Sequence, residues 1–120
     1  MKILIVGAGA TGGYFGARLA RAGRDVTFLV RPARAAALRA TGLQVLSPHG
    51  DFGVAPRLAL AGEIDTPFDV VLVTVKAHAL AAAIEDFAPA VGPQTMILPV
   101  LNGLKHVDDL SARFGADRVV

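Results

Sequence analysis

The chain has 120 residues, of which 53% are hydrophobic and 18% charged, with no cysteine and a formal net charge of +2. This composition suits one compact domain, and it excludes a disordered chain, disulfide bonds and cysteine chemistry. No apolar run approaches the roughly 20 residues of a membrane helix, and the opening run is too short for a signal peptide. We therefore predict a cytoplasmic protein without a membrane partner.

The first 31 residues follow the order strand, glycine turn, helix and strand. Lys2–Val6 is an apolar run typical of a buried parallel strand, and a second run follows over Val26–Val30. Between them, the glycine turn GAGATG (residues 7–12) opens a helical pattern that continues to about Ala22. This is the G-x-G-x-x-G arrangement in the context expected of a dinucleotide site. The alternative is a strand-to-helix turn with no ligand, and the flanking strands and helix favour the site.

Each glycine of this turn has a physical reason in such a site. Gly7 permits the tight turn, Gly9 lets the backbone approach a pyrophosphate, and Gly12 lets the helix pack closely on the strand. The N–H groups at the positive end of the helix then face the diphosphate. Gly12, Gly16 and Ala20 are spaced four apart, which leaves one helix face nearly bare of side chains. We expect this face to approach the sheet or the cofactor closely.

The residue that follows the second strand bears on the choice of cofactor. Enzymes that prefer NAD usually carry Asp or Glu here to bind the ribose hydroxyls, and such a carboxylate would repel a 2′-phosphate. This chain has Arg31, whose guanidinium can grip a phosphate in a bidentate fork. Arg31 therefore predicts NADP(H), with Arg34 as a second contact one turn into the next helix. The alternative is an arginine that is only solvated.

The middle of the chain departs from a plain alternation of strands and helices. Ala33–Ala40 predicts a short helix ended by Gly42. Leu43–Ser47 and Phe52–Arg57 are extended runs separated by turn residues, which predicts a hairpin inserted into the domain. His49, in the turn, is interpreted as a turn residue and not as a catalytic one.

Asp69–Val75 has the pattern of a strand buried on both faces. Lys76 follows at its carboxyl end, which is the edge where ligands bind in open α/β sheets. A lysine there can hold a phosphate or a carboxylate. The alternative is a lysine that extends to solvent, and position alone does not choose between the two.

The rest of the chain predicts two further helices and a strand. We expect a helix over Ala77–Ala88, a strand over Thr95–Leu98, and a last helix over residues 107–114 before a further strand begins at 118–120. Asn102 follows a strand end, where a helix N-cap or Asn-Gly turn is the simpler interpretation and a site residue the alternative. Zinc-ligand spacing, a serine-hydrolase elbow and basic clusters interleaved with aromatic residues are missing from the sequence. We predict no metal site and no nucleic-acid partner.

Together these stretches resemble one known family over essentially the whole chain. The match lies in GAGATGGYFGARLARAG, the arginine after the second strand, GLQVLSPHGDF, DVVLVTVKAHAL and LNG. In this combination they resemble ketopantoate reductase (2-dehydropantoate 2-reductase), of whose usual length the chain matches the amino-terminal half. The resemblance implies a Rossmann-type doubly wound, mainly parallel sheet with an inserted hairpin. It also implies reduction of ketopantoate to pantoate with NADPH, on the route to pantothenate and coenzyme A.

The resemblance also assigns roles to single residues. Arg31 would bind the 2′-phosphate, Lys76 would contact the cofactor, and Asn102 would lie near the nicotinamide ribose and the substrate. Leu101 stands where the family often has Gln, which puts the polar contact of that residue in doubt. The diphosphate would be bound by the glycine turn, that is by Gly7, Ala8, Gly9, Ala10, Thr11 and Gly12.

In the family, a lysine that acts as general acid lies in a mostly helical second domain, together with several substrate-binding polar residues. Residues 1–120 end before that domain, so we expect one NADP(H)-binding domain with no catalytic residue of its own. It should bind NADPH without turnover, because ketone reduction also needs a proton donor. We also expect self-association through the face left open by the missing domain. The alternatives are a reductase of another 2-keto acid and a stand-alone nucleotide-sensing module.

Overall fold

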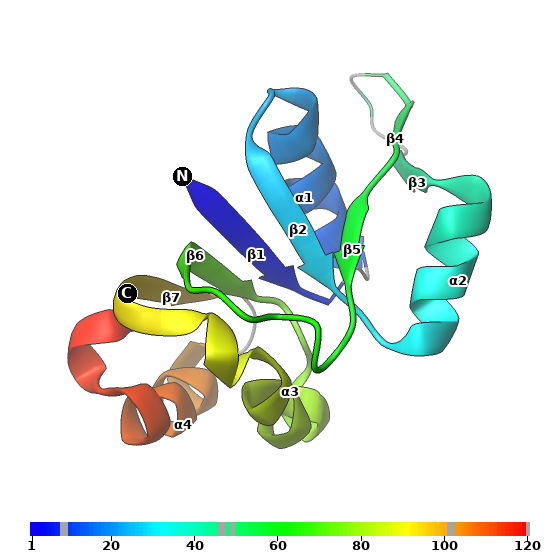
Figure 1. Ribbon diagram of the computed structural model, residues 1–120. Helices are drawn as coiled ribbons and strands as arrows, with labels where there is room; N and C mark the ends of the chain where they lie inside the picture. Colours follow the sequence, from blue (N-terminus) through cyan, green and yellow to red (C-terminus); the bar gives the residue numbers. More distant parts are fainter. Residues whose placement is uncertain (8–9, 46–47, 49, 101–102, 120) are drawn as a thin grey trace.

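The computed structural model describes the chain except for residues 8–9, 46–47, 49, 101–102 and 120. Figure 1 shows the described part as a central sheet with helices on both faces. Its elements are β1 (Lys2–Val6), α1 (Ala10–Arg21), β2 (Asp25–Leu29), α2 (Pro32–Thr41), β3 (Leu43–Val45), β4 (Phe52–Val54), β5 (Arg57–Ala59), β6 (Phe68–Val73), α3 (Leu80–Phe87), β7 (Val91–Pro99) and α4 (Gly103–Phe114). Short 3₁₀ turns cover Ala77–Ala79, Ala88–Ala90 and Ala116–Arg118.

The main sheet has five strands in the order β5-β2-β1-β6-β7, and every neighbouring pair is parallel. β1 lies between β2 and β6, with Val6 paired to Leu29 on one side and to Val73 on the other. The carboxyl ends of these three strands therefore meet at one edge. The order reverses direction at β1, which is the doubly wound arrangement that the sequence predicts.

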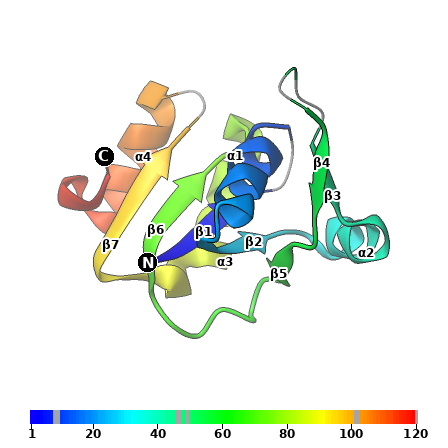
Figure 2. The same ribbon diagram turned by 90° about the horizontal axis from the view of Figure 1, so that it is seen from above.

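Helices cover both faces of this sheet. α1 packs on the face that carries Ile5 and Phe28, while α3 and α4 cover the opposite face (Figure 2). The close approach predicted for α1 is to the sheet, because a Cβ on Gly16 would overlap the ring of Phe28. None of the helices in the described ranges is long and apolar enough to cross a membrane.

The predicted hairpin is present but shorter than expected. β3 and β4 form a separate antiparallel pair, with Val45 opposite Phe52. The prediction of one strand over Phe52–Arg57 was wrong, because β4 ends at Val54 and Arg57 begins β5, parallel to β2. Pro56 separates the two strands, since it has no N–H to give to a ladder. His49 lies outside the described residues.

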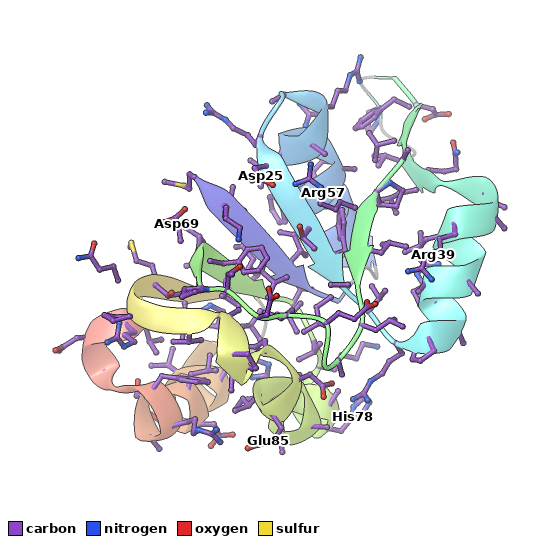
Figure 3. All side chains as sticks on the ribbon, viewed as in Figure 1. Asp25, Arg39, Arg57, Asp69, His78 and Glu85 are labelled. Carbon is purple, nitrogen blue, oxygen red and sulfur yellow. The ribbon has the colours of Figure 1, made fainter. Side chains whose placement is uncertain are left out.

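An ion pair between exposed side chains also joins β5 to β2. Arg57 pairs with Asp25 at the start of β2, and Figure 3 shows the two side chains together across the neighbouring strands. Both side chains are well exposed, at 67% for Arg57 and 43% for Asp25. Such an exposed pair contributes little to stability, typically about 0.2–1 kcal/mol, so β5 is held mainly by its parallel backbone pairing with β2.

Two later elements differ in length from their predictions. The helix expected over Ala77–Ala88 is a 3₁₀ turn followed by the shorter α3. β7 begins at Val91, before the predicted Thr95, and includes two prolines, Pro93 and Pro99, which an edge strand tolerates. Of the strand predicted at 118–120, Arg118 ends a 3₁₀ turn instead, and Val119 makes a single isolated parallel bridge to Ile97.

Candidate functional site

The candidate site begins where β1 ends. Gly7 has φ +100°, a left-handed conformation that side chains rarely adopt, so the turn after β1 depends on a glycine here. The Gly7 N–H donates to the carbonyl oxygen of Leu29 at 2.9 Å. The glycine turn is thereby tied to the end of β2, which is also where Arg31 leaves the sheet.

Thr74 organises the packing around this turn. Its Oγ1 donates to the carbonyl oxygen of Val6 at 2.8 Å, and its backbone N–H approaches the same oxygen at 3.3 Å. A Cβ on Gly7 would lie 3.1 Å from Thr74 Oγ1. One on Gly12 would lie 2.5 Å from Thr74 Oγ1 and 2.8 Å from the Gly7 carbonyl oxygen. Close packing therefore favours glycine at both Gly7 and Gly12, and at Gly7 the backbone conformation favours it as well.

The start of α1 is suited to an anion. The helix begins at Ala10 and carries no acidic residue in its first turn, so no carboxylate of that turn competes for its N–H groups. Its positive end lies at the carboxyl edge of the sheet beside Gly7. Ala10 and Thr11 contribute backbone to this first turn, while Ala8 and Gly9 lie outside the described residues.

A pocket of about 360 Å³ opens beside the glycine turn, between the end of β2 and α3. We call it the arginine pocket, after the two arginines that line it, Arg31 and Arg34. Apolar side chains form most of the remaining surface. They come from the ends of β1 and β2, from the loop after β5, and from the segment between β6 and α3, and they include Val6, Leu29, Val30, Leu60, Ala61, Val75, Ala79 and Ala83.

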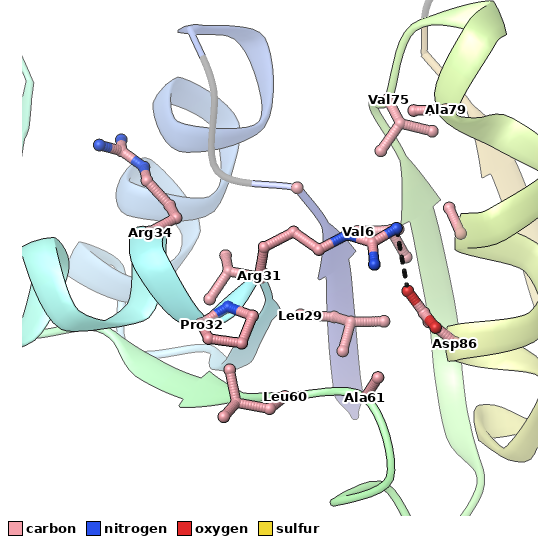
Figure 4. Close-up of a pocket in the computed structure, with 13 residues that line it drawn as sticks. Val6, Leu29, Arg31, Pro32, Arg34, Leu60, Ala61, Val75, Ala79 and Asp86 are labelled. Carbon is pink, nitrogen blue, oxygen red and sulfur yellow. Dashed lines mark ion pairs between the residues drawn. The ribbon is translucent and has the colours of Figure 1, made fainter.

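Arg31 crosses this pocket toward α3. Its guanidinium Nη2 lies 3.5 Å from Asp86 Oδ2, and Figure 4 shows the side chain extended over Leu29 to reach it. The Arg31 side chain is 65% exposed and that of Asp86 23%. Arg34 extends away from this pair in the same view. The pocket thus combines an apolar surface with a surplus of positive charge, which suits a ligand with a flat apolar group and an anionic one.

Lys76 lies at the same edge of the sheet, past the end of β6. Its side chain is exposed, and its carbonyl oxygen accepts a hydrogen bond from the Ala79 N–H at 2.9 Å, which starts the 3₁₀ turn. No ion pair joins its ammonium group to the part of the chain that the structure describes. Val75 and Ala79 line the arginine pocket, but Lys76 itself does not.

His106 ties α4 to the peptide that precedes Lys76. Its side chain is fully buried, and its Nε2 donates to the carbonyl oxygen of Val75 at 2.9 Å. Its Nδ1 is buried without a hydrogen-bond partner among the described residues. The sequence predictions overlooked this role, although His106 shares a four-residue spacing with Leu110 and Phe114 that marks the buried stripe of the helix.

Three residues that shape the site, Thr74, Asp86 and His106, were not predicted from the sequence. Asn102 and Leu101, for which roles were predicted, lie outside the described residues, so the geometry says nothing of them. The described part of the chain has no group of three or more His, Asp or Glu side chains arranged to hold a metal ion.

Comparison with known proteins places the chain among reductases. The family model described as ketopantoate reductase PanE/ApbA matches residues 3–120. A Bacillus subtilis protein, named as the uncharacterized oxidoreductase YkpB, is 46% identical over 120 residues, which are 100% of this chain and 39% of that one.

Solved structures share the fold over nearly the whole chain. The 2-dehydropantoate 2-reductase of Geobacter metallireducens superimposes with a TM-score of 0.88 and 42% identity, covering 99% of this chain and 40% of that one. D-mandelate dehydrogenase, in a ternary structure with NADH and anilino(oxo)acetate, superimposes with a TM-score of 0.87 and 27% identity, covering 99% and 39%. The chain spans about two fifths of the length of these relatives. The family match, the sequence identity and the shared fold agree, and the chain belongs to the PanE/ApbA ketopantoate reductase family of oxidoreductases.

Proposed function

We propose that this chain binds NADPH and forms the cofactor-binding part of a 2-dehydropantoate 2-reductase, which reduces ketopantoate to pantoate. The observation that carries the proposal is the arginine pocket, which adjoins Gly7 and is crossed by the arginine that follows β2. The family to which the chain belongs supports the reaction class. The chain itself would be the NADP(H)-binding domain of the enzyme.

The residues present fit the parts of the cofactor. The diphosphate would lie on the N–H groups at the start of α1, where packing of Gly12 against Thr74 brings the helix close to the strand. The adenosine would occupy the apolar part of the arginine pocket. Arg31 would bind the 2′-phosphate, with Arg34 as a second cation.

The nicotinamide end would extend along the carboxyl edge toward Lys76 and Asn102. When bound, the cofactor supplies the hydride for the keto carbon. Lys76, exposed and without an ion-pair partner in the described ranges, would hold a negative group of cofactor or substrate and stabilise a developing alkoxide. None of the described side chains is paired with Lys76 as a proton donor, so we infer that the chain alone binds NADPH without turnover.

Calorimetry on the chain tests the cofactor assignment. We expect tighter binding of NADPH than of NADH, and a loss of at least about tenfold in NADPH affinity for Arg31→Glu, because a charge-assisted phosphate contact becomes a repulsion. Arg39→Glu is the matched control, since it makes the same charge change on α2 at a side chain that does not line the arginine pocket. Equal affinity for the two cofactors, or an Arg31→Glu variant that binds NADPH like the Arg39→Glu control, would contradict the assignment.

A reductase of another 2-keto acid is the second candidate. It is favoured by the shared fold with D-mandelate dehydrogenase, whose ternary structure holds NADH and anilino(oxo)acetate. The two candidates separate by steady-state kinetics on a form of the protein extended to the length of its relatives. A higher kcat/KM for ketopantoate than for an aromatic 2-keto acid supports the first proposal, and the reverse order supports the second.

A further inference from the structure

Asp86 is the one acidic side chain among the described residues that line the arginine pocket. It lies in the last turn of α3, is 23% exposed, and faces Arg31 across the pocket (Figure 4). The residue before it, Glu85, is 68% exposed and pairs instead with Arg113 of α4. Two consecutive acids on one helix therefore serve different arginines, and only Asp86 reaches the pocket.

Asp86 and the 2′-phosphate of the proposed ligand compete for the guanidinium of Arg31. A 2′-phosphate carries about two negative charges at neutral pH and would need the guanidinium that Asp86 contacts at 3.5 Å. A dinucleotide without that phosphate does not need this contact with Arg31. The negative charge of Asp86 also repels the phosphate directly. Its contact with Arg31 and this repulsion therefore both weaken binding of the phosphate.

We propose that Asp86 is an internal counter-ion of Arg31 that competes with the 2′-phosphate and thereby moderates the preference for NADPH over NADH. This inference rests on the proposed NADP(H) site and adds a residue that sets its specificity. Asp86 acts through Arg31, holding the guanidinium across the pocket until the phosphate displaces the carboxylate. Its effect is confined to ligands that carry the phosphate.

The experiment compares Asp86→Asn with Glu85→Gln in the same chain, by calorimetry with NADPH and with NADH at low ionic strength. Each variant removes one negative charge from the last turn of α3, but only the first removes it from the pocket. We expect Asp86→Asn to bind NADPH about threefold more tightly, the size typical of releasing an exposed ion pair, with NADH affinity unchanged. Glu85→Gln should leave both affinities unchanged.

An Arg31→Ala background shows whether the effect passes through Arg31. There, Asp86→Asn should raise the NADPH affinity less than it does beside Arg31, because only the direct repulsion of the phosphate is left to remove, while an undiminished gain would overturn the counter-ion role. Thermal unfolding checks that the variants are folded, and Asp86→Ser provides a second neutral replacement should Asn be poorly tolerated in the helix.

The outcomes separate this inference from the proposed function. If the wild-type chain prefers NADPH but Asp86→Asn behaves like Glu85→Gln, or binds NADPH more weakly, the counter-ion role is wrong and the NADPH site stands. If the wild-type chain binds NADPH no better than NADH, the proposed site itself fails.

Discussion

The glycine turn and the arginine pocket lie at the same edge of the sheet, but different forces shape them. At the turn, α1 packs so closely that a methyl group added at Gly12 would lie 2.5 Å from Thr74 Oγ1 and 2.8 Å from the Gly7 carbonyl oxygen. Across the pocket, Arg31 reaches Asp86 through an exposed pair at 3.5 Å. Close packing tolerates little change, whereas an exposed charge pair is weak and sensitive to salt. We therefore expect mutations at the turn to change stability, and mutations in the pocket to change ligand preference.

The largest effect should come from Gly12→Ala. Alanine is the better helix former by about 1 kcal/mol, but its Cβ would meet Thr74 Oγ1 and the Gly7 carbonyl oxygen. Because neither the backbone nor a side chain held by Val6 can move freely, we expect the free energy of unfolding to fall by about 2 kcal/mol. Urea unfolding measures this, with Arg18→Ala on the exposed face of the same helix as control. An unchanged or higher stability for Gly12→Ala would contradict the packing account.

His106→Leu tests the other packed contact at this edge. Leucine fills much of the space but leaves the Val75 carbonyl oxygen without its buried donor, so we expect a loss of about 1–2 kcal/mol in the free energy of unfolding. His78→Leu is the matched control, because His78 is exposed in the 3₁₀ turn before α3 (Figure 3). Equal stabilities of the two variants would mean that the His106 contact adds nothing.

Salt should separate the two cofactors in the pocket. Raising the salt concentration from about 0.05 M to about 0.5 M screens exposed charges, so the NADPH affinity should fall more steeply than the NADH affinity. The difference between the two slopes, measured by fluorescence titration, reports on the phosphate contact alone. Parallel slopes for the two cofactors would show that the 2′-phosphate does not lie near the arginines.

Arg34→Ala should have the smallest effect. Arg34 lines the pocket but extends away from the Arg31–Asp86 pair, so it would add a secondary, exposed contact to the phosphate. We expect the NADPH affinity to fall about two- to threefold with little change in NADH affinity. A loss as large as that of Arg31→Glu would make Arg34 the principal phosphate ligand and reverse the proposed order of the two residues.

Local sequence patterns predicted much of the fold. The apolar runs, the spacing of Gly12, Gly16 and Ala20, and the turn residues before Phe52 are local signals with direct structural causes. Predicted strand boundaries were wrong where an extended stretch of sequence is interrupted. At Pro56, one such stretch is divided into two strands that belong to different sheets.

Of the ion pair in the arginine pocket, the sequence pointed to only one member. Arg31 was predicted from its place after the second strand, but its partner Asp86 comes from a helix far along the chain and meets it only through the tertiary fold. The role of His106 likewise depends on how α4 packs beside β6, since its acceptor is a backbone oxygen that no residue pattern reveals. The roles predicted for the glycine turn, Arg31, Arg34, Lys76 and Asn102 in cofactor binding stay predictions.

The most direct measurement compares two fragments of the cofactor, 2′,5′-ADP and 5′-AMP, by calorimetry and by amide chemical-shift titration of the chain. The two ligands differ only in the 2′-phosphate, so their difference isolates the contact assigned to Arg31. We expect tighter binding of 2′,5′-ADP, with the largest shifts at Gly7, at Arg31 and along the pocket-lining part of α3. Equal affinity for the two ligands, or shifts at another surface, would contradict it.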